Sequence, residues 1–348
     1  MATSVTDAAW LNWIGNLLDA SAGRESASPK DSDDFGCVLE QQPSHLVPER
    51  LLRKLGNIEK RGDLIFNPRC QLPGHGQPPS GLADASSTLP NSRQAKARIV
   101  WVQNAETESW QPYWVSPELG ATIRQLQQDP SRIGDLSSRV CSLLKLAEIL
   151  VVPGAAAVRY ARWKQIVENC GRKFHKDCYA PIAGGIHPFQ LGELRRYFRR
   201  QIRRGKVRLG DGQSPLRYIA HNDPAARFFH DQLTTAVSDL IGEPVKPSYV
   251  YMASYQGGAR LERHTDRTQC EFSVTLCVDY APEPIGATPW PLYLETRVGT
   301  ATIYQALGDG LLYRGRDLPH YRKTLAPGHI STSIFFHYVA KDFVGPLE

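Results

Sequence analysis

The chain contains no apolar run near the roughly twenty residues that a membrane-spanning helix needs. It also lacks a Cys-x-x-Cys pair, and its seven cysteines are scattered, which disfavours a zinc site, an iron–sulfur cluster or a disulfide framework. Scattered, unpaired thiols are typical of a reducing cytoplasm. The net charge of +6 is mild and indicates no particular class of partner. We therefore predict a cytoplasmic protein that does not contact membranes.

The length of 348 residues, with 41% hydrophobic and 22% charged residues, is enough for two globular domains with a sizeable core. We assign residues 1–153 to an N-terminal extension that is partly irregular. Ala8–Ala20 is predicted as an amphipathic helix, because it lacks the basic start and cleavage site of a signal peptide. Ser21–Asp34 and Gln71–Ser92 are rich in Ser, Pro, Gly and Asp and predict irregular loops around a short helix near Pro48–Asn57.

Residues 97–153 have a clearer pattern, with two strands followed by two helices and a closing strand. This order is the outline of a small winged-helix unit that could recruit a substrate. The plainer alternative, an α+β extension that packs on the rest of the protein, is favoured because no residue motif supports recruitment. The expected elements are Ile99–Gln103, Pro112–Val115, Pro117–Gln127, Ile133–Leu146 and Ile149–Val152.

The second half, residues 154–348, begins with helices and continues with strands. Helices are predicted at Ala155–Val167, Pro188–Arg204 and Ala225–Ile241. The strands that follow are short and separated by Gly and Pro turns, which indicates antiparallel sheets wrapped into a jelly roll. We therefore predict an α+β protein with a jelly-roll core and supporting helices. The strands are Pro247–Tyr255, Cys270–Tyr280, Trp290–Thr296, Ala301–Gln305 and Ile330–Val339.

The helix Pro188–Arg204 carries most of the basic residues of this half. Arginines that grip phosphates would indicate a nucleic-acid or ribosome-directed protein. The same helix has a stripe of large apolar residues, so its arginines are expected on the opposite, solvated face. We therefore regard a nucleic-acid partner as unlikely.

The stretch Tyr255–Asp266 ends in His-Thr-Asp. If it is a strand, His264 and Asp266 point to the same face. Two imidazoles and one carboxylate on one face of an octahedron are the ligands of iron(II) centres that activate dioxygen. A third ligand is expected downstream, where a Gly308-Asp309-Gly310 turn, a short apolar strand and a second turn lead to His320, 56 residues after His264.

In this order and spacing, residues 245–342 resemble the iron(II)/2-oxoglutarate-dependent oxygenases, and in particular their prolyl-4-hydroxylase-like branch. The matching residues are Tyr255, Gly257, Gly258, His264, Asp266, Gly308, Asp309 and His320. The resemblance implies a double-stranded β-helix that binds iron(II), through His264, Asp266 and His320, together with 2-oxoglutarate and O2.

The activity that the resemblance implies is hydroxylation of an unactivated C–H bond, with release of succinate and CO2. We expect the substrate to be an amino acid or a peptide or protein side chain. The alternatives are a nucleic-acid- or ribosome-directed oxygenase and a non-catalytic jelly-roll binding module. An intact metal triad argues against the module.

The anchor for the far carboxylate of 2-oxoglutarate departs from the family pattern. The pattern has Arg or Lys nine or ten residues after the distal histidine, where this chain has His329 and Ile330. One alternative is that His329 takes this role with Ser331 or Ser333. The other is an arginine from elsewhere, for which Arg322 is the first choice because it shares a strand face with His320. The weaker candidates are Arg267, Tyr251 and Tyr255.

His337 is the rival for the place of the distal ligand. It lies late in the closing strand between aromatic residues, where a buried structural histidine is the more frequent identity. We therefore predict His320 as the ligand.

Overall fold

The computed structural model of the chain describes residues 35–42, 46–48, 63–72, 79, 82 and 98–348. These residues form two compact units. The first contains the described residues up to Tyr160 together with His187–Tyr197, and the second contains Ala161–Ile186 and Phe198–Glu348. The chain thus passes between the units three times, whereas the sequence interpretation placed a single boundary after residue 153.

Some predicted segments lie outside this description. The predicted helix Ala8–Ala20 and the stretch Ser21–Asp34 lie wholly outside it. Of the predicted helix Pro48–Asn57 only Pro48 is described, and most of Gln71–Ser92 also lies outside. Among the described helices, none combines the length and the apolarity that a membrane crossing requires.

The first unit contains a three-stranded antiparallel sheet in the order β2-β3-β4 and two α-helices. Each helix begins at a serine cap: the Oγ of Ser116 accepts a hydrogen bond from the N–H of Leu119, and that of Ser137 accepts one from Val140. The elements are β1 (Ile65–Phe66), β2 (Cys70–Gln71), β3 (Arg98–Gln103), β4 (Trp110–Val115), α4 (Pro117–Gln128), α5 (Ser138–Leu146) and β5 (Leu150–Val151).

Two expectations for this unit need correction. The predicted helix Ile133–Leu146 is two elements, because the 3-10 helix η6 (Pro130–Asp135) ends before Ser137, whose cap starts α5. The closing strand β5 pairs with β1 and not with the β3–β4 hairpin. The helices therefore follow the hairpin in the predicted order, but the last strand is not part of its sheet.

The helix α7 (Pro188–Arg203) does not present the solvated arginine face that we expected. Arg195 is only 1% exposed and donates from Nη1 to the carbonyl of Leu46, 2.8 Å away. Further along, Arg199 forms two hydrogen bonds, of 2.5 and 2.8 Å, with the carboxylate of Asp279. These arginines bind groups of the protein itself, because the helix is buried on more than its apolar stripe.

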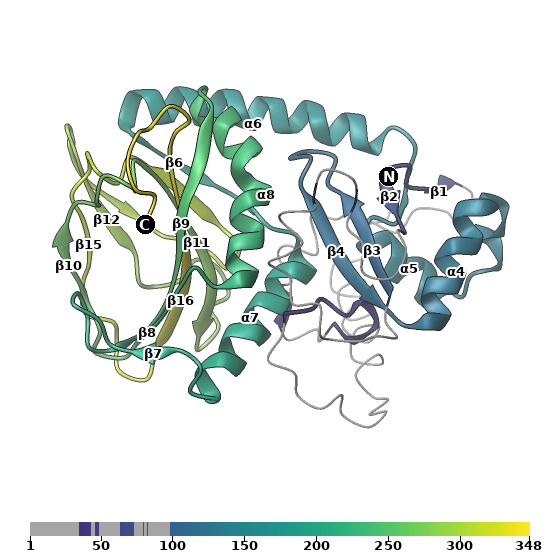
Figure 1. The fold of residues 1–348 in the computed structure, drawn as a ribbon, viewed down its shortest axis with the longest axis horizontal. Helices are drawn as coiled ribbons and strands as arrows, with labels where there is room; N and C mark the ends of the chain where they lie inside the picture. The colour runs from purple at the N-terminus through teal and green to yellow at the C-terminus, as the bar shows by residue number, and fades with distance from the viewer. Residues whose placement is uncertain (1–34, 43–45, 49–62, 73–78, 80–81, 83–97) are drawn as a thin grey trace, which may run out of the picture. The chain divides into compact units, whose positions relative to one another are not determined.

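The second unit contains two antiparallel sheets (Figure 1). The larger has seven strands in the order β6-β14-β11-β16-β9-β8-β7, and the smaller has four in the order β10-β15-β12-β13. The strands are β6 (Tyr179–Ile182), β7 (Arg208–Leu209), β8 (Arg217–His221), β9 (Val245–Gln256), β10 (Leu261–His264), β11 (Phe272–Ala281), β12 (Leu292–Thr296), β13 (Gly299–Ile303), β14 (Gly310–Tyr313), β15 (His320–Arg322) and β16 (Ile330–Ala340).

The long strands β9, β11 and β16 lie in the middle of the larger sheet and are mostly buried. The helix α8 (Pro224–Ile241) packs along this sheet (Figure 1), where the ring of His230 bonds the carbonyl of His337 at 2.8 Å and the hydroxyl of Tyr338 donates to the carbonyl of His230. The predicted strands are thus present, with their ends shifted by a few residues.

Three elements differ from the expectations. The helix α6 (Ala155–Asp177) is ten residues longer than the predicted Ala155–Val167. The strand β6 was not predicted, because a proline lies within its four residues. Arg217–His221, where no strand was predicted, forms the strand β8, paired with β9.

Candidate metal centre

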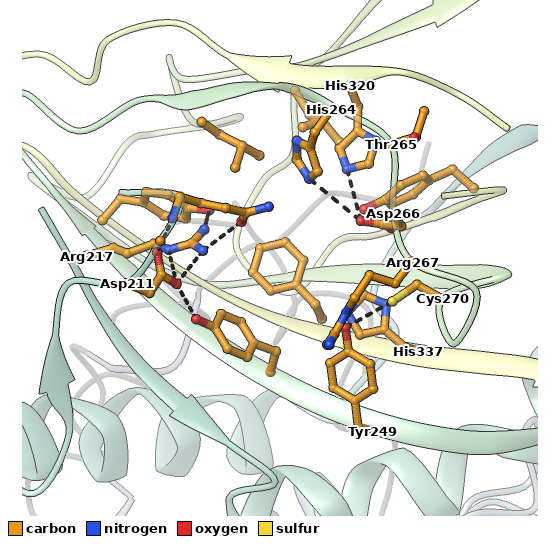
Figure 2. A pocket seen from close by; sticks show the side chains of 18 residues that line it. Asp211, Arg217, Tyr249, His264, Thr265, Asp266, Arg267, Cys270, His320 and His337 are labelled. Atoms are coloured by element: carbon orange, nitrogen blue, oxygen red, sulfur yellow. Dashed lines mark hydrogen bonds and ion pairs between the residues drawn. The ribbon is translucent and has the colours of Figure 1, made fainter. Parts of the chain in front are cut away.

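The two predicted histidine ligands meet on neighbouring strands of the smaller sheet. His264 ends β10 and His320 opens β15, and the two residues are directly paired, with ring centroids 4.3 Å apart. The carboxylate of Asp266 lies beside both rings, with its Oδ1 3.7 Å from Nε2 of His264 and 3.6 Å from Nε2 of His320 (Figure 2). The structure therefore brings the three predicted metal ligands together.

The position of Asp266 differs from the expectation that it shares a strand with His264. The strand β10 ends at His264, so Asp266 is held by other contacts. Its N–H donates to the carbonyl of Gly315 (2.9 Å), and its Oδ2 accepts a hydrogen bond from Ser273 (3.0 Å). Neither residue was singled out in the sequence, because Gly315 lies in a turn distant in the chain and the direction of Ser273 depends on the pairing of β11.

Gly315 leaves the space that Asp266 occupies. A Cβ at this position would lie 2.0 Å from Oδ2 of Asp266 and 2.9 Å from Oγ of Ser273. A glycine is needed here for close packing and not for an unusual backbone angle, since only a side chain would collide.

The hydrogen bonds of the two histidines fix which ring nitrogen faces Asp266. Nδ1 of His264 lies 2.8 Å from the carbonyl of Glu262, and Nδ1 of His320 lies 2.9 Å from the carbonyl of Leu318. A nitrogen that faces a carbonyl must carry the proton, so each neutral ring presents a bare Nε2. Burial lowers the pKa of His320, which favours this neutral form.

Three acceptor atoms thus converge on one point: two imidazole lone pairs and a carboxylate oxygen. Acceptors repel one another unless a cation lies between them. The distances from Oδ1 to the two rings are less than twice a metal–ligand bond of about 2.0–2.2 Å, so one ion can reach the carboxylate and either ring. The donor set fits a divalent metal, and two histidines with one carboxylate are typical of non-haem iron(II).

A second group of candidate ligands consists of Asp266, Cys270 and His337. Nδ1 of His337 lies 2.9 Å from the hydroxyl of Ser273, which in turn donates to Oδ2 of Asp266, so His337 supports the carboxylate through Ser273. Cys270 contacts the hydroxyl of Tyr249 at 3.0 Å, and burial raises its pKa to about 12, so it remains a thiol and a poor ligand. Burial also lowers the pKa of His337 to about 4. These contacts favour His320 over His337 as the ligand.

The triad lies in a pocket of about 420 Å³ between the two sheets of the second unit. Figure 2 shows that the triad occupies one side of this pocket and that Asp211 and Arg217 occupy another. The lining residues from the larger sheet include Arg217, Tyr249, Tyr251, Tyr255, Tyr313, Phe335 and His337, and those from the smaller sheet are Leu261, His264, Leu292 and His320.

The pair of Asp211 and Arg217 was missed by the sequence analysis. Arg217 lies on β8 and donates from Nε to Oδ2 of Asp211 (2.9 Å) and from Nη1 to the hydroxyl of Tyr255 (2.7 Å). Burial opposes ionisation of Asp211, but hydrogen bonds from Arg217 and Tyr251 lower its pKa to about 2. The available signal was the run Arg217–His221 before Asn-Asp-Pro, which suits a strand that ends in a turn.

The candidate anchors for 2-oxoglutarate lie in different places. Tyr251 and Tyr255 line the pocket, whereas Arg322, His329, Ser331 and Ser333 do not. Ser331 and Ser333 are buried and share a face of β16 with Phe335 by the two-residue period.

Arg322 is buried beside the pocket. Its Nη1 donates to the carbonyl of Trp290 at 2.5 Å, and its guanidinium lies 4.7 Å from the centroid of the Trp290 ring. His329 is half-buried, and its Nδ1 lies 2.8 Å from the hydroxyl of Tyr280, a residue that the sequence analysis did not consider.

No protein-family model and no curated protein sequence matches the chain. Among solved structures, a Pseudomonas putida prolyl-4-hydroxylase has a TM-score of 0.40 at 16% identity, over 49% of this chain and 98% of that protein. A prolyl hydroxylase from Trichoplax adhaerens, in complex with a peptide fragment of hypoxia inducible factor, has a TM-score of 0.43 at 13% identity, over 52% and 92%.

The epimerase SnoN from nogalamycin biosynthesis, in complex with Fe3+ and α-ketoglutarate, has a TM-score of 0.43 at 12% identity, over 51% of this chain and 84% of that protein. The structures to which the chain is similar over about half of its length are thus two prolyl hydroxylases and an epimerase.

Proposed function

We propose that this protein is an iron(II)- and 2-oxoglutarate-dependent dioxygenase whose two sheets form a double-stranded β-helix. It hydroxylates an unactivated C–H bond of an amino acid or of a peptide or protein side chain and releases succinate and CO2. The observation that supports this function is the convergence of the bare Nε2 atoms of His264 and His320 on the carboxylate of Asp266. Two histidines and a carboxylate leave open positions on an iron ion.

Iron(II), when bound, supplies the open positions at which 2-oxoglutarate and O2 react, and hence the oxidising power for the C–H bond. The residues of the chain hold and orient the reactants. Ser273 and the N–H of Asp266 fix the carboxylate, and the backbone carbonyls of Glu262 and Leu318 fix the histidine rings. The tyrosine and leucine side chains of the pocket limit access of water to the reacting atoms.

Arg322 is our proposed anchor for the far carboxylate of 2-oxoglutarate. It shares a face of β15 with His320, and two residues along a strand span roughly 6.6 Å, which is comparable with the length of a five-carbon diacid. Burial lowers the pKa of Arg322, and the titratable groups that oppose this shift are phenols and a thiol, such as Tyr255 and Cys277. In the described part of the chain no carboxylate forms an ion pair with it, whereas Arg217 is already paired with Asp211.

We expect Arg322→Met to raise the KM for 2-oxoglutarate roughly ten- to a hundredfold, because a charge-assisted contact of about 1.5–3 kcal/mol is lost. Methionine keeps most of the side-chain volume, and lysine should restore binding only in part. The measurement is succinate formation as a function of 2-oxoglutarate, with thermal unfolding to verify the fold. A wild-type KM in Arg322→Met, combined with a raised KM in His329→Ala, would assign the anchor to His329.

The proposed function is tested by iron-dependent formation of succinate from 2-oxoglutarate. The purified protein is assayed with free amino acids, a peptide pool and RNA, with and without iron(II). Succinate formation that needs iron and increases with an amino acid or a peptide supports the proposal. Stimulation by RNA alone would replace it with the nucleic-acid alternative. Absence of iron binding would leave only a binding module.

A further inference from the structure

Of the charged side chains that line the pocket, most are already compensated. Arg217 and Asp211 form an ion pair, and Oδ1 of Asp211 also accepts the N–H groups of Gln213 and Ser214 at 3.0 and 2.9 Å. Asp266 belongs to the metal centre. The remaining charge is Arg267, which lines the pocket and is exposed. Within the described residues no carboxylate forms an ion pair with it.

Arg267 is held in place although it is exposed. Its guanidinium lies 5.0 Å from the centroid of the Tyr249 ring and is hydrogen-bonded to the side chain of Tyr249. Tyr249 is itself fixed in β9, because its ring packs against His337 at 4.7 Å and against His221 at 5.1 Å. The carbonyl of Arg267 accepts a hydrogen bond from the N–H of Cys270, which fixes the turn. Figure 2 shows Arg267 beside Tyr249, next to Asp266.

A cation that is fixed on a pocket wall and forms no ion pair with a carboxylate of the described residues is suited to an anionic group of a ligand. Arg267 directly follows Asp266, so consecutive Cα atoms place it about 3.8 Å along the backbone from a metal ligand. It lies outside the strand β15 that carries Arg322, which we assign to the cosubstrate. We therefore assign an anion bound by Arg267 to the substrate. The carbon atoms next to this anion would lie on the side of the pocket that holds the three candidate metal ligands.

We propose that the substrate is a small molecule with a free carboxylate, such as a free amino acid, and that Arg267 binds this carboxylate at the pocket wall. This inference rests on the proposed function and narrows its substrate class. The pocket of about 420 Å³ is at the lower end of the roughly 300–1,000 Å³ of small-molecule sites. A residue inside a peptide has no carboxylate on its backbone, so Arg267 would have no counter-charge there.

The experiment compares free L-amino acids with the corresponding amino-acid amides and with end-blocked peptides. Two readouts are used: succinate formed above the rate without substrate, and binding to the metal-free protein by ligand-observed NMR. We expect acids to bind and stimulate and amides to do so far more weakly. In Arg267→Ala, the KM for a stimulating acid should rise roughly ten- to a hundredfold, since a hydrogen bond to a charged group is lost. Arg267→Lys should recover part of this loss.

The matched control is Arg297→Ala, which removes an exposed arginine in the turn between β12 and β13, outside the pocket. The inference is overturned if amides or end-blocked peptides stimulate as well as the acids, if no carboxylate binds, or if Arg267→Ala retains the wild-type KM. Absence of succinate under all conditions would refute the proposed function instead. In that case, NMR binding of an acid that Arg267→Ala abolishes would still support the anion site.

Discussion

Replacement of His320 or Asp266 by alanine is expected to abolish iron binding and 2-oxoglutarate turnover. Each residue supplies one of the three converging acceptor atoms. Oδ1 of Asp266 lies 3.7 Å from Nε2 of His264 and 3.6 Å from Nε2 of His320. Loss of a group that only orients a ligand costs roughly 10–100-fold in metal affinity, so loss of the ligand itself should cost at least about a hundredfold. Metal affinity is measured by competition with a chelator, and turnover by succinate formation.

His337→Ala is the matched comparison for this test. His337 is also a buried histidine near Asp266, but its Nδ1 bonds Ser273 and it does not converge on the triad. We expect a variant that binds iron more weakly than the wild type yet retains turnover. Circular dichroism verifies that each variant is folded. Full turnover in His320→Ala together with its loss in His337→Ala would transfer the ligand role to His337.

The second large effect is expected from Gly315→Ala, a change of one methyl group outside the triad. The new Cβ would lie 2.0 Å from Oδ2 of Asp266, a distance that no real contact allows, so the carboxylate must move. Overpacking of this kind costs roughly 1–3 kcal/mol of stability. We expect metal affinity to fall at least roughly tenfold, because the carboxylate loses its position relative to the two rings.

Gly286→Ala is the control for Gly315→Ala. A Cβ at Gly286 meets no atom within 4 Å, so both affinity and stability should remain close to wild type. Urea unfolding separates a general loss of stability from a specific loss of metal. If Gly315→Ala binds iron as tightly as Gly286→Ala, the turn after β14 does not position Asp266.

The sequence predicted the triad because spacing and turn chemistry are local properties. His264, Asp266 and His320 each follow a recognisable strand or turn, and the order of these elements is specific. The contacts that hold Asp266 could not be predicted in the same way. Ser273 and Gly315 reach it through the pairing of β11 with β14, and the register of that pairing depends on the whole sheet.

The pocket wall was less predictable than the metal centre. Arg217 lies on a strand that was not predicted, and its partner Asp211 lies in a turn without a motif. The basic helix α7 was expected to be solvated on one side, since arginines usually lie on the surface. The carbonyl of Leu46, which accepts the hydrogen bond of the buried Arg195, lies in a distant segment of the chain. Local periodicity does not reveal such a contact.

The two compact units cannot be obtained by cutting the chain once. Residues 187–197 belong to the first unit although the second begins before them, at Ala161, and the helix α7 continues from one unit into the other. In that first unit, His187 bonds the carbonyl of Leu146 and Gln190 bonds that of Pro112. A gene fragment that starts after residue 153 would thus encode the whole of α7 but not the carbonyls of Leu146 and Pro112, which His187 and Gln190 bond. Replacement of the first unit by that of another protein would have to include residues 187–197. Recombination at a single point in the gene is therefore disfavoured, both in evolution and in engineering.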